Sequence, residues 1–249
     1  MDVINSKVFV HTPLEQFEII PLLPFNITNA TVFTVLAITT FSLLLHFGTY
    51  NSTLVPNRWQ SVIELLYGII LDMVQDTLGE AGVRYFPFIF TTFTFILSCN
   101  LLGMIPYTFT VTSHILITFS LGLATFTGIN IIAFRKHGLH FLSFFLPKDV
   151  PFVLIPFLVV LEFVSYIFRV FSLSIRLFAN MMAGHTLLKI LAGFAWTMLS
   201  VGGIFYVLHL FPLAIVFALT GLELGIAFLQ AYVWTILVCI YLNDAIVLH

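Results

Sequence analysis

Long stretches without charged residues are the feature of this sequence that most restricts its fold. No Asp, Glu, Lys or Arg occurs in residues 19–57, 85–134 or 190–222. A helix needs about 20 apolar residues to cross the hydrocarbon core of a bilayer, so these stretches have room for several crossings. Only 8% of the 249 residues are charged and mean hydropathy is +1.11, which leaves too little polar surface for a soluble globule. The sequence therefore predicts an all-α integral membrane protein.

Charge and cysteine content exclude several classes of protein. The formal net charge of −2 provides no basic patch to replace the counterions of phosphate groups, so we expect no nucleic acid partner. Cys99 and Cys239 lie in apolar segments and lack the paired spacing of a disulfide framework or a metal site, and we expect no metal or other cofactor. Residues 1–18 fit neither an Arg-rich transit peptide nor a basic secretory signal.

The first part of the chain is predicted to be one short segment followed by one crossing. We treat residues 1–249 as a single membrane domain, in which residues 1–27 form an N-terminal segment. Residues 28–47 are predicted to form the first spanning helix, because the turn-forming stretch from Gly48 to Pro56 follows them.

Residues 57–80 have the pattern of an amphipathic helix. Four acidic residues fall on one helical stripe, Glu64, Asp72, Asp76 and Glu80. The other side is apolar, with Val62, Ile63, Leu66, Ile69, Ile70 and Met73. A helix with one charged and one apolar side is expected to lie along the membrane surface.

The uncharged stretch 85–134 is too long for a single crossing. It contains Pro106 and the polar residues 108–113 near its centre, so the sequence predicts a hairpin of two spanning helices. A polar loop is expected over residues 135–151.

Two long helices are predicted in the last part of the chain. Residues 156–192 read as one helix of about 55 Å, which exceeds the roughly 30 Å bilayer core, so this helix must tilt or bend. Gly202 and Gly203 mark a turn, and residues 204–246 form the second helix, with Pro212 as a kink site. A short connection makes the two helices antiparallel neighbours.

Basic residues indicate how the chain is oriented in the membrane. One set falls in loops on one side of the predicted topology: Arg58, Arg84, Arg135, Lys136 and Lys148. Lys7 and Lys189 belong to the other side. Because loops rich in Lys and Arg stay inside, the N-terminus is predicted outside and the C-terminus inside.

Each long helix carries one stripe of polar residues. The first has a charged residue at every seventh position, Glu162, Arg169 and Arg176. The second has polar residues separated by 7 and 14 positions, Glu223, Gln230 and Asp244. Seven residues make nearly two helical turns, so each set stays on one face with about 20° of drift per step.

Antiparallel packing with the stripes face to face would group these residues by membrane depth. Arg176 and Gln230 are each 14 residues from an acid of the stripe, so they are expected to meet at one level. Glu162 and Asp244 are then expected to converge toward the inside.

A second cluster is expected toward the outside, where His185 approaches Glu223. His185 is nine residues past Arg176, about half a turn off the stripe on an ideal helix. Contact with Glu223 therefore requires curvature or a bend near Gly184.

The charge of Arg176 restricts what this arrangement does. An arginine near the middle of a bilayer costs about 2.5–3.5 kcal/mol on insertion scales, so it needs a partner or a function. Two titratable clusters separated by a charge that cannot release its proton suit two proton half-channels divided by a barrier. Alternatively, the acids and arginines pair off as buried contacts between helices.

Three motifs resemble a known family. They are Ser172–His185 (SLSIRLFANMMAGH), Gln230–Trp234 (QAYVW) and Tyr241–Ala245 (YLNDA). These motifs resemble subunit a of the rotary F-type ATP synthase, in its mitochondrial form. The likeness is strong over residues 156–249 and weaker over 12–18 and 98–106.

The resemblance implies a task for Arg176 at a rotating ring of c subunits. The arginine would attract each ring carboxylate and block direct proton leakage between the half-channels. At about 4 Å and an effective dielectric constant of 20, such an attraction is worth roughly 4 kcal/mol. Asn180 belongs to the same motif.

The resemblance also assigns the acids to two half-channels. Glu223 and His185 would line the outer one, with Asn100 as a companion, and Glu162 and Asp244 would line the inner one. Bacterial relatives typically have the acid at the position of His185 and the histidine at that of Glu223, an exchange that suits residues acting as a pair.

Partners and location follow from the same resemblance. The implied partners are the ring of c subunits, the b subunit of the peripheral stalk, other small membrane subunits, the lipid bilayer and protons. The location would be the mitochondrial inner membrane, with the N-terminus in the intermembrane space and the C-terminus in the matrix. No phosphate-binding Gly-rich motif is present, so no catalysis of ATP chemistry is expected on this chain.

Three alternatives remain at this level. A secondary ion or proton transporter, or a channel subunit, would be expected to show inverted repeats with broken helices, and the two halves of the chain show no such symmetry. A haem-binding subunit would need matched histidines on a pair of spanning helices, whereas His46, His114 and His209 are isolated. A structural scaffold would leave Arg176 without a task.

Overall fold

The predicted all-α membrane architecture is confirmed. The computed structural model describes residues 14–23, 27–50, 52–105, 108–138, 141 and 154–246. Five helices in these ranges are long and apolar enough to cross a membrane. The strands found there form one short antiparallel pair. Pro106, Lys7, Lys148 and most of the expected loop 135–151 lie outside the described residues.

The elements follow one another in a simple order. They are η1 (Glu15–Phe17), β1 (Pro21–Leu23), β2 (Ile27–Thr28), α1 (Asn29–Thr49), α2 (Arg58–Leu78), η2 (Glu80–Tyr85), α3 (Phe86–Gly103), η3 (Val111–Ser113), α4 (Ile115–His137), α5 (Ile155–Val201), α6 (Phe205–Leu208) and α7 (Leu210–Ile246).

Helix α2 is amphipathic, and one residue of the expected stripe lies beyond it. The Asn57 side chain accepts a hydrogen bond from the amide of Arg58 and so caps the start of the helix. The acids of α2 are exposed, whereas Ile70 and Met73 are buried. Glu80 belongs to η2 instead, because Gly79, a poor helix former, ends α2.

The expected hairpin consists of α3 and α4, and its second helix is longer than predicted. Helix α4 continues to His137 through the basic residues of its last turn, which suit the negative end of a helix. Lys136 and His137 also approach the main-chain carbonyl oxygen of Ile246, at 3.2 and 3.0 Å. Side chains of α4 thereby satisfy a carbonyl at the C-terminus of α7.

Helix α5 is longer than the predicted range 156–192. It contains 47 residues, Ile155–Val201, so it extends about 70 Å at 1.5 Å per residue. The sequence offers no strong stop signal at 192, since Ala and Gly are tolerated inside membrane helices. The helix ends where Gly202 and Gly203 adopt φ angles of 75° and 64°, a conformation that favours glycine.

The predicted helix 204–246 corresponds to one candidate membrane span, Phe205–Ile246, with an interruption near its start. Helix α6 ends at Leu208 and α7 begins at Leu210, on either side of His209. Pro212 lies in the first turn of α7, where its missing amide hydrogen costs no helical bond.

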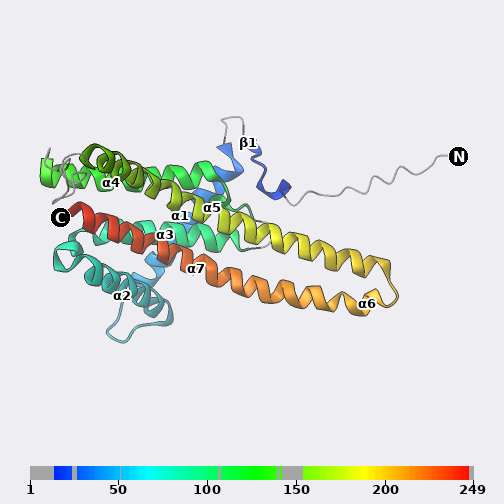
Figure 1. Cartoon of the computed structure of the whole chain (residues 1–249). Helices are drawn as coiled ribbons and strands as arrows, with labels where there is room; N and C mark the ends of the chain where they lie inside the picture. The colour runs from blue at the N-terminus through cyan, green and yellow to red at the C-terminus, as the bar shows by residue number, and fades with distance from the viewer. Residues whose placement is uncertain are drawn as a thin grey trace.

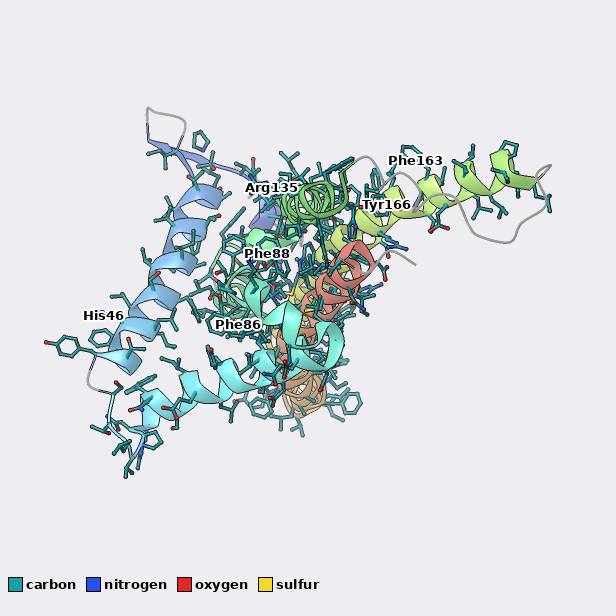
Figure 2. All side chains as sticks on the ribbon, turned by 90° about the vertical axis from the view of Figure 1, so that its left-hand side faces the viewer. His46, Phe86, Phe88, Arg135, Phe163 and Tyr166 are labelled. Carbon is teal, nitrogen blue, oxygen red and sulfur yellow. The ribbon has the colours of Figure 1, made fainter. Side chains whose placement is uncertain are left out.

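Helices α5 and α7 lie side by side and antiparallel, and they extend beyond the other helices to the turn at α6 (Figure 1). Helix α1 packs against α3 at the edge of the bundle, and α2 returns from its end toward α3 (Figure 2). The first turns of α5, around Phe163, project away from the bundle on the other side (Figure 2).

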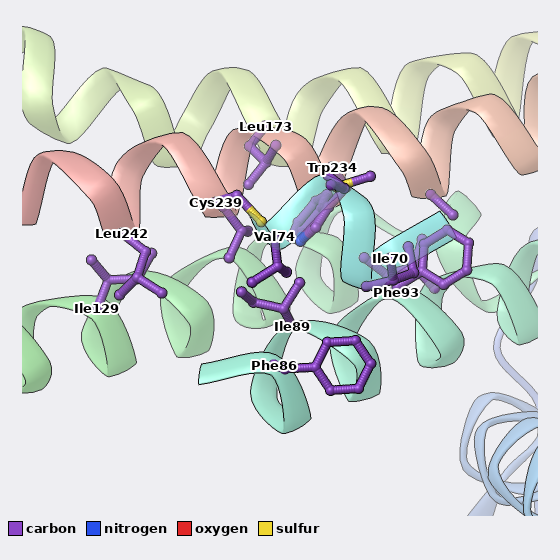
Figure 3. Packing of buried hydrophobic residues seen from close by; sticks show 14 of the residues in the cluster. Ile70, Val74, Phe86, Ile89, Phe93, Ile129, Leu173, Trp234, Cys239 and Leu242 are labelled. Carbon is purple, nitrogen blue, oxygen red and sulfur yellow. The ribbon is translucent and has the colours of Figure 1, made fainter. Parts of the chain in front are cut away.

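One hydrophobic cluster joins α2, α3, α4, α5 and α7 (Figure 3). Trp234 of α7 and Phe93 of α3 are its largest fully buried side chains. In a membrane, lipid is as apolar as these side chains, so the cluster stabilises the bundle through close packing rather than through removal from water.

We expect Phe93→Ala to destabilise the bundle. Phe→Ala substitutions in packed cores lower the free energy of unfolding by about 3–5 kcal/mol. We expect a value at the lower end of this range, because lipid and not water surrounds a membrane bundle. The midpoint of thermal unfolding of the full chain in detergent checks this. Phe217→Ala is the matched control, because Phe217 is 82% exposed and Phe93 is 0% exposed. Equal midpoints for the two variants would contradict the assigned core.

Candidate functional site

Three polar contacts join α5 to α7 at successive levels. Arg169 pairs with Asp244, Asn180 with Gln230, and His185 with Glu223. Residue numbers rise along α5 as they fall along α7, as antiparallel helices require. The two polar stripes therefore face each other as the sequence predicts, although Asp244 and Gln230 have other partners than expected.

The contact nearest the turn between α5 and α7 is between His185 and Glu223, as expected from the sequence. Nδ1 of His185 lies 3.7 Å from Oε1 of Glu223, which is an ion pair when the histidine is protonated but is too long for a hydrogen bond. The side chains are 12% and 6% exposed. Neither carboxylate oxygen of Glu223 has a hydrogen-bond partner among the described residues.

Gly184 explains how this pair comes together. A side chain at this position would overlap the Glu223 carboxylate, so the carboxylate packs directly against the main chain of α5. The absence of a Cβ atom allows this close approach. A continuous α5 thus brings His185 to Glu223, although His185 lies off the face that carries Arg176.

The next contact corrects the prediction for Gln230. The side chain of Asn180 donates a hydrogen bond to Oε1 of Gln230, at 3.0 Å. Asn180 lies one turn past Arg176 on α5, so at this level the contact is displaced by about one turn from the predicted one. Gln230 therefore meets the amide of the motif and not its arginine.

Arg176 itself is exposed on α5. In the part of the chain that the structure describes, no hydrogen bond or ion pair joins its guanidinium to another side chain. A charged group at this depth needs a partner, because an unpaired charge in hydrocarbon is costly.

The contact farthest from the turn between α5 and α7 corrects the prediction for Glu162. Asp244 accepts a hydrogen bond from Nη1 of Arg169 at 3.1 Å, with side chains that are 36% and 23% exposed. The Arg169 guanidinium also lies over the rings of Tyr166 and Tyr241, at 5.6 and 5.2 Å from their centroids. This arginine has an ion pair and two cation–π contacts.

Glu162 does not meet Asp244 as predicted. Within the described residues, Asp244 forms its ion pair with Arg169. Glu162 lies seven residues before Arg169 on α5. The physical reason is the path of α5, whose first turns leave the bundle near Phe163 (Figure 2). Glu162 follows these turns outward, whereas Asp244 stays against α5 at Arg169.

Asn100 connects α3 to the same region of α7. Its side chain is fully buried and donates a hydrogen bond to the carbonyl oxygen of Ala227, at 3.1 Å. Ala227 lies one turn from Glu223 and three residues before Gln230. Asn100 therefore supports the segment of α7 that carries both residues.

Two cavities border the His185–Glu223 pair. One of about 420 Å³ lies between α5 and α7, and its lining includes Asn180, Gly184, Glu223 and Gln230. The other, of about 730 Å³, is lined in part by His185 and Glu223. A water molecule occupies about 30 Å³ in the liquid, so both cavities are large enough for several waters. Glu223 thus lies at the border of both cavities.

The charged and titratable groups of the site are distributed along the two helices. No group of three or more His, Cys, Asp or Glu side chains able to hold a metal ion occurs among the described residues. Instead, titratable pairs lie at two depths, and a permanently charged guanidinium lies between them. The roles of Tyr166 and Tyr241 were missed from the sequence, since aromatic rings on apolar helices give no distinct signal.

Comparisons with known proteins identify the family. The family model for the ATP synthase A chain matches residues 30–243. ATP synthase subunit a of Marchantia polymorpha is 59% identical over 249 residues, covering 96% of this chain and 99% of the relative. Subunit a of Chondrus crispus is 55% identical, with 98% and 100% covered, and that of Brassica napus is 58% identical, with 96% and 97% covered.

The matched residues include both long helices and all the polar contacts between them except that of Asp244, which lies one residue beyond the match. The relatives are plant and algal subunits, which agrees with the mitochondrial form that the motif around Arg176 resembles. This chain belongs to the ATP synthase A chain family and is a multi-pass membrane protein of that enzyme's membrane sector.

Proposed function

We propose that this chain is the stator subunit that provides two offset proton half-channels and presents Arg176 to the ring of c subunits. The observation that carries this proposal is the isolation of Arg176. It is exposed and unpaired within the described residues, between the His185–Glu223 contact and the Arg169–Asp244 contact. Along α5 it lies about 14 Å from His185 and about 11 Å from Arg169.

The outer half-channel is assigned to His185, Glu223 and the nearby Asn100. In this proposal a proton enters the 730 Å³ cavity, reaches the His185–Glu223 pair and passes through the smaller cavity to a ring carboxylate. The 3.7 Å separation of the pair supports relay through water, because groups that lie too far apart for a direct hydrogen bond are commonly bridged by a water molecule.

The inner half-channel is assigned to Asp244 and Glu162. Arg169 holds the Asp244 carboxylate in place through its ion pair, and Glu162 lies further along α5, where the helix leaves the bundle. A proton released by the ring would pass Asp244 and leave near Glu162. Arg169 is thus a positioning residue in this proposal.

Arg176 keeps the two half-channels apart. Its guanidinium cannot release a proton, and it attracts each ring carboxylate with roughly 4 kcal/mol at 4 Å and a dielectric constant of 20. The ring site therefore releases its proton toward the inner half-channel before it passes. Asn180 and Gln230 hold α5 and α7 together one turn away from this point.

The remaining assignments follow from the family. We infer a location in the mitochondrial inner membrane, with the N-terminus in the intermembrane space and the C-terminus in the matrix. The proposed partners are the ring of c subunits, the b subunit of the peripheral stalk and other small membrane subunits. The whole chain, residues 1–249, acts as one membrane domain without a nucleotide site, and neither a transporter nor a haem-binding subunit is supported.

Arg176→Ala tests the barrier directly. We expect proton pumping driven by ATP hydrolysis to fall to background in membranes with an assembled complex, and passive proton leak to rise, because the charge between the half-channels is removed. Arg135→Ala is the matched control, since Arg135 is an exposed arginine at the end of α4, away from the polar contacts. Normal pumping by Arg176→Ala would refute the half-channel assignment.

Gly184→Ala tests the outer half-channel. A methyl group at this position must displace the Glu223 carboxylate, so we expect a marked loss of pumping rate. Gly193→Ala on the same helix is the control, because no atom lies within 4 Å of the new methyl group. Both changes favour helix formation by up to about 1 kcal/mol, so altered helix propensity does not explain a difference between them. Equal pumping rates would show that the position of Glu223 is not critical.

A further inference from the structure

The larger cavity reaches an N-terminal segment for which the proposed mechanism has no task. Besides His185 and Glu223, its lining includes Gln16 and Glu18 of the segment that precedes β1. The cavity therefore connects residues that are far apart in the sequence, Gln16 and Glu18 with His185 and Glu223. Gln16 and Glu18 are exposed, whereas Glu223 is buried.

Hydrogen bonds fix this segment to the start of α1. The Asn29 side chain donates to the carbonyl oxygen of Glu18 at 2.9 Å and accepts from the amide of Ile20 at 3.3 Å. The amide of Asn29 donates to the carbonyl oxygen of Ile20 at 3.1 Å. The β1–β2 pair closes the same turn. Glu18 is therefore held at one side of the cavity by main-chain contacts.

The titratable and charged groups that line the cavity determine what its mouth attracts. Among the described side chains these are Glu18, His185, Lys189 and Glu223. Glu18 is the carboxylate nearest to bulk water, while Glu223 is the carboxylate at the buried end. A carboxylate at the entrance of a cleft raises the local concentration of cations, including protons.

We propose that residues 14–20 form the mouth of the outer half-channel and that Glu18 is the carboxylate that collects protons there. This inference rests on the proposed function of the His185–Glu223 pair. In the step that it adds, the Glu18 carboxylate accepts one proton from water or buffer outside. It then gives this proton to water in the cavity, which returns Glu18 to its ionised form.

Glu18→Gln in the complete ATP synthase tests the role of the carboxylate. In reconstituted vesicles at constant driving force, we expect ATP synthesis to slow by up to about fivefold at alkaline outer pH. This factor corresponds to the attraction for a proton that is lost when one nearby unit charge in water is removed. At acidic outer pH, proton supply does not limit the rate, and the variant should match the unchanged enzyme. Identical pH profiles would overturn the proposal.

Glu64→Gln is the matched control for this experiment. Glu64 is also an exposed carboxylate, but it lies on α2 and does not line the cavity. We expect its pH profile to equal that of the unchanged enzyme. If Glu64→Gln and Glu18→Gln shifted the profile equally, the effect would be one of general surface charge and the proposal would fail.

Gln16→Cys tests the mouth without changing a charged residue. Cys99 and Cys239 are buried, so a water-soluble cationic thiol reagent should modify the new cysteine, with the same reagent on the unchanged enzyme as the blank. We expect modification to slow proton uptake, and an anionic reagent of similar size to slow it less. A modified enzyme with its full rate, or a cysteine that the reagent does not reach, would overturn the proposal.

These outcomes are separate from a failure of the proposed function. If residues 14–20 are not the mouth, Arg176→Ala still abolishes pumping while Glu18→Gln and the modified Gln16→Cys behave as the unchanged enzyme. If the half-channels themselves are wrongly assigned, Arg176→Ala pumps normally.

Discussion

Contact between the polar faces of α5 and α7 fixes the position of the candidate groups on these two helices. Polar side chains on an apolar helix are costly in lipid unless they meet partners, and these two helices supply partners for each other at three levels. The same packing leaves Arg176 on an open face, because the residues around it are already paired. One constraint therefore pairs Glu223 and Asp244 and leaves Arg176 without a hydrogen bond or ion pair to a described side chain.

The close approach of the two helices also determines where water can reach. Gly184 lets the Glu223 carboxylate lie against the α5 main chain, so Glu223 borders a cavity on each side. At the other end Arg169 lies over two tyrosine rings and holds Asp244. The His185–Glu223 contact is thus buried beside two cavities, whereas the Arg169–Asp244 contact is partly exposed and is bordered by aromatic rings.

The apolar bundle supports this arrangement from the opposite side of α7. Trp234 and its neighbours pack on α2, α3 and α4, and Asn100 adds a hydrogen bond from α3 (Figure 3). Lys136 and His137 hold the carbonyl at the end of α7, two residues past Asp244. Helix α7 is therefore held on one face by the bundle, which leaves its polar face for α5.

Sequence patterns determined the class of the fold and the set of candidate residues. Uncharged stretches predict the membrane helices, since crossing lipid requires apolar length, and seven-residue spacing predicts that each polar stripe stays on one helical face. Neither pattern specifies the register of one helix against its neighbour or the position at which a helix bends. Tertiary packing alone decided that Asp244 meets Arg169 and not Glu162, that Gln230 meets Asn180, and that the N-terminal segment reaches the cavity of Glu223. The register of two helices and the path of a long helix depend on side-chain contacts that several elements make at once. The spacing of residues along one helix does not specify these contacts.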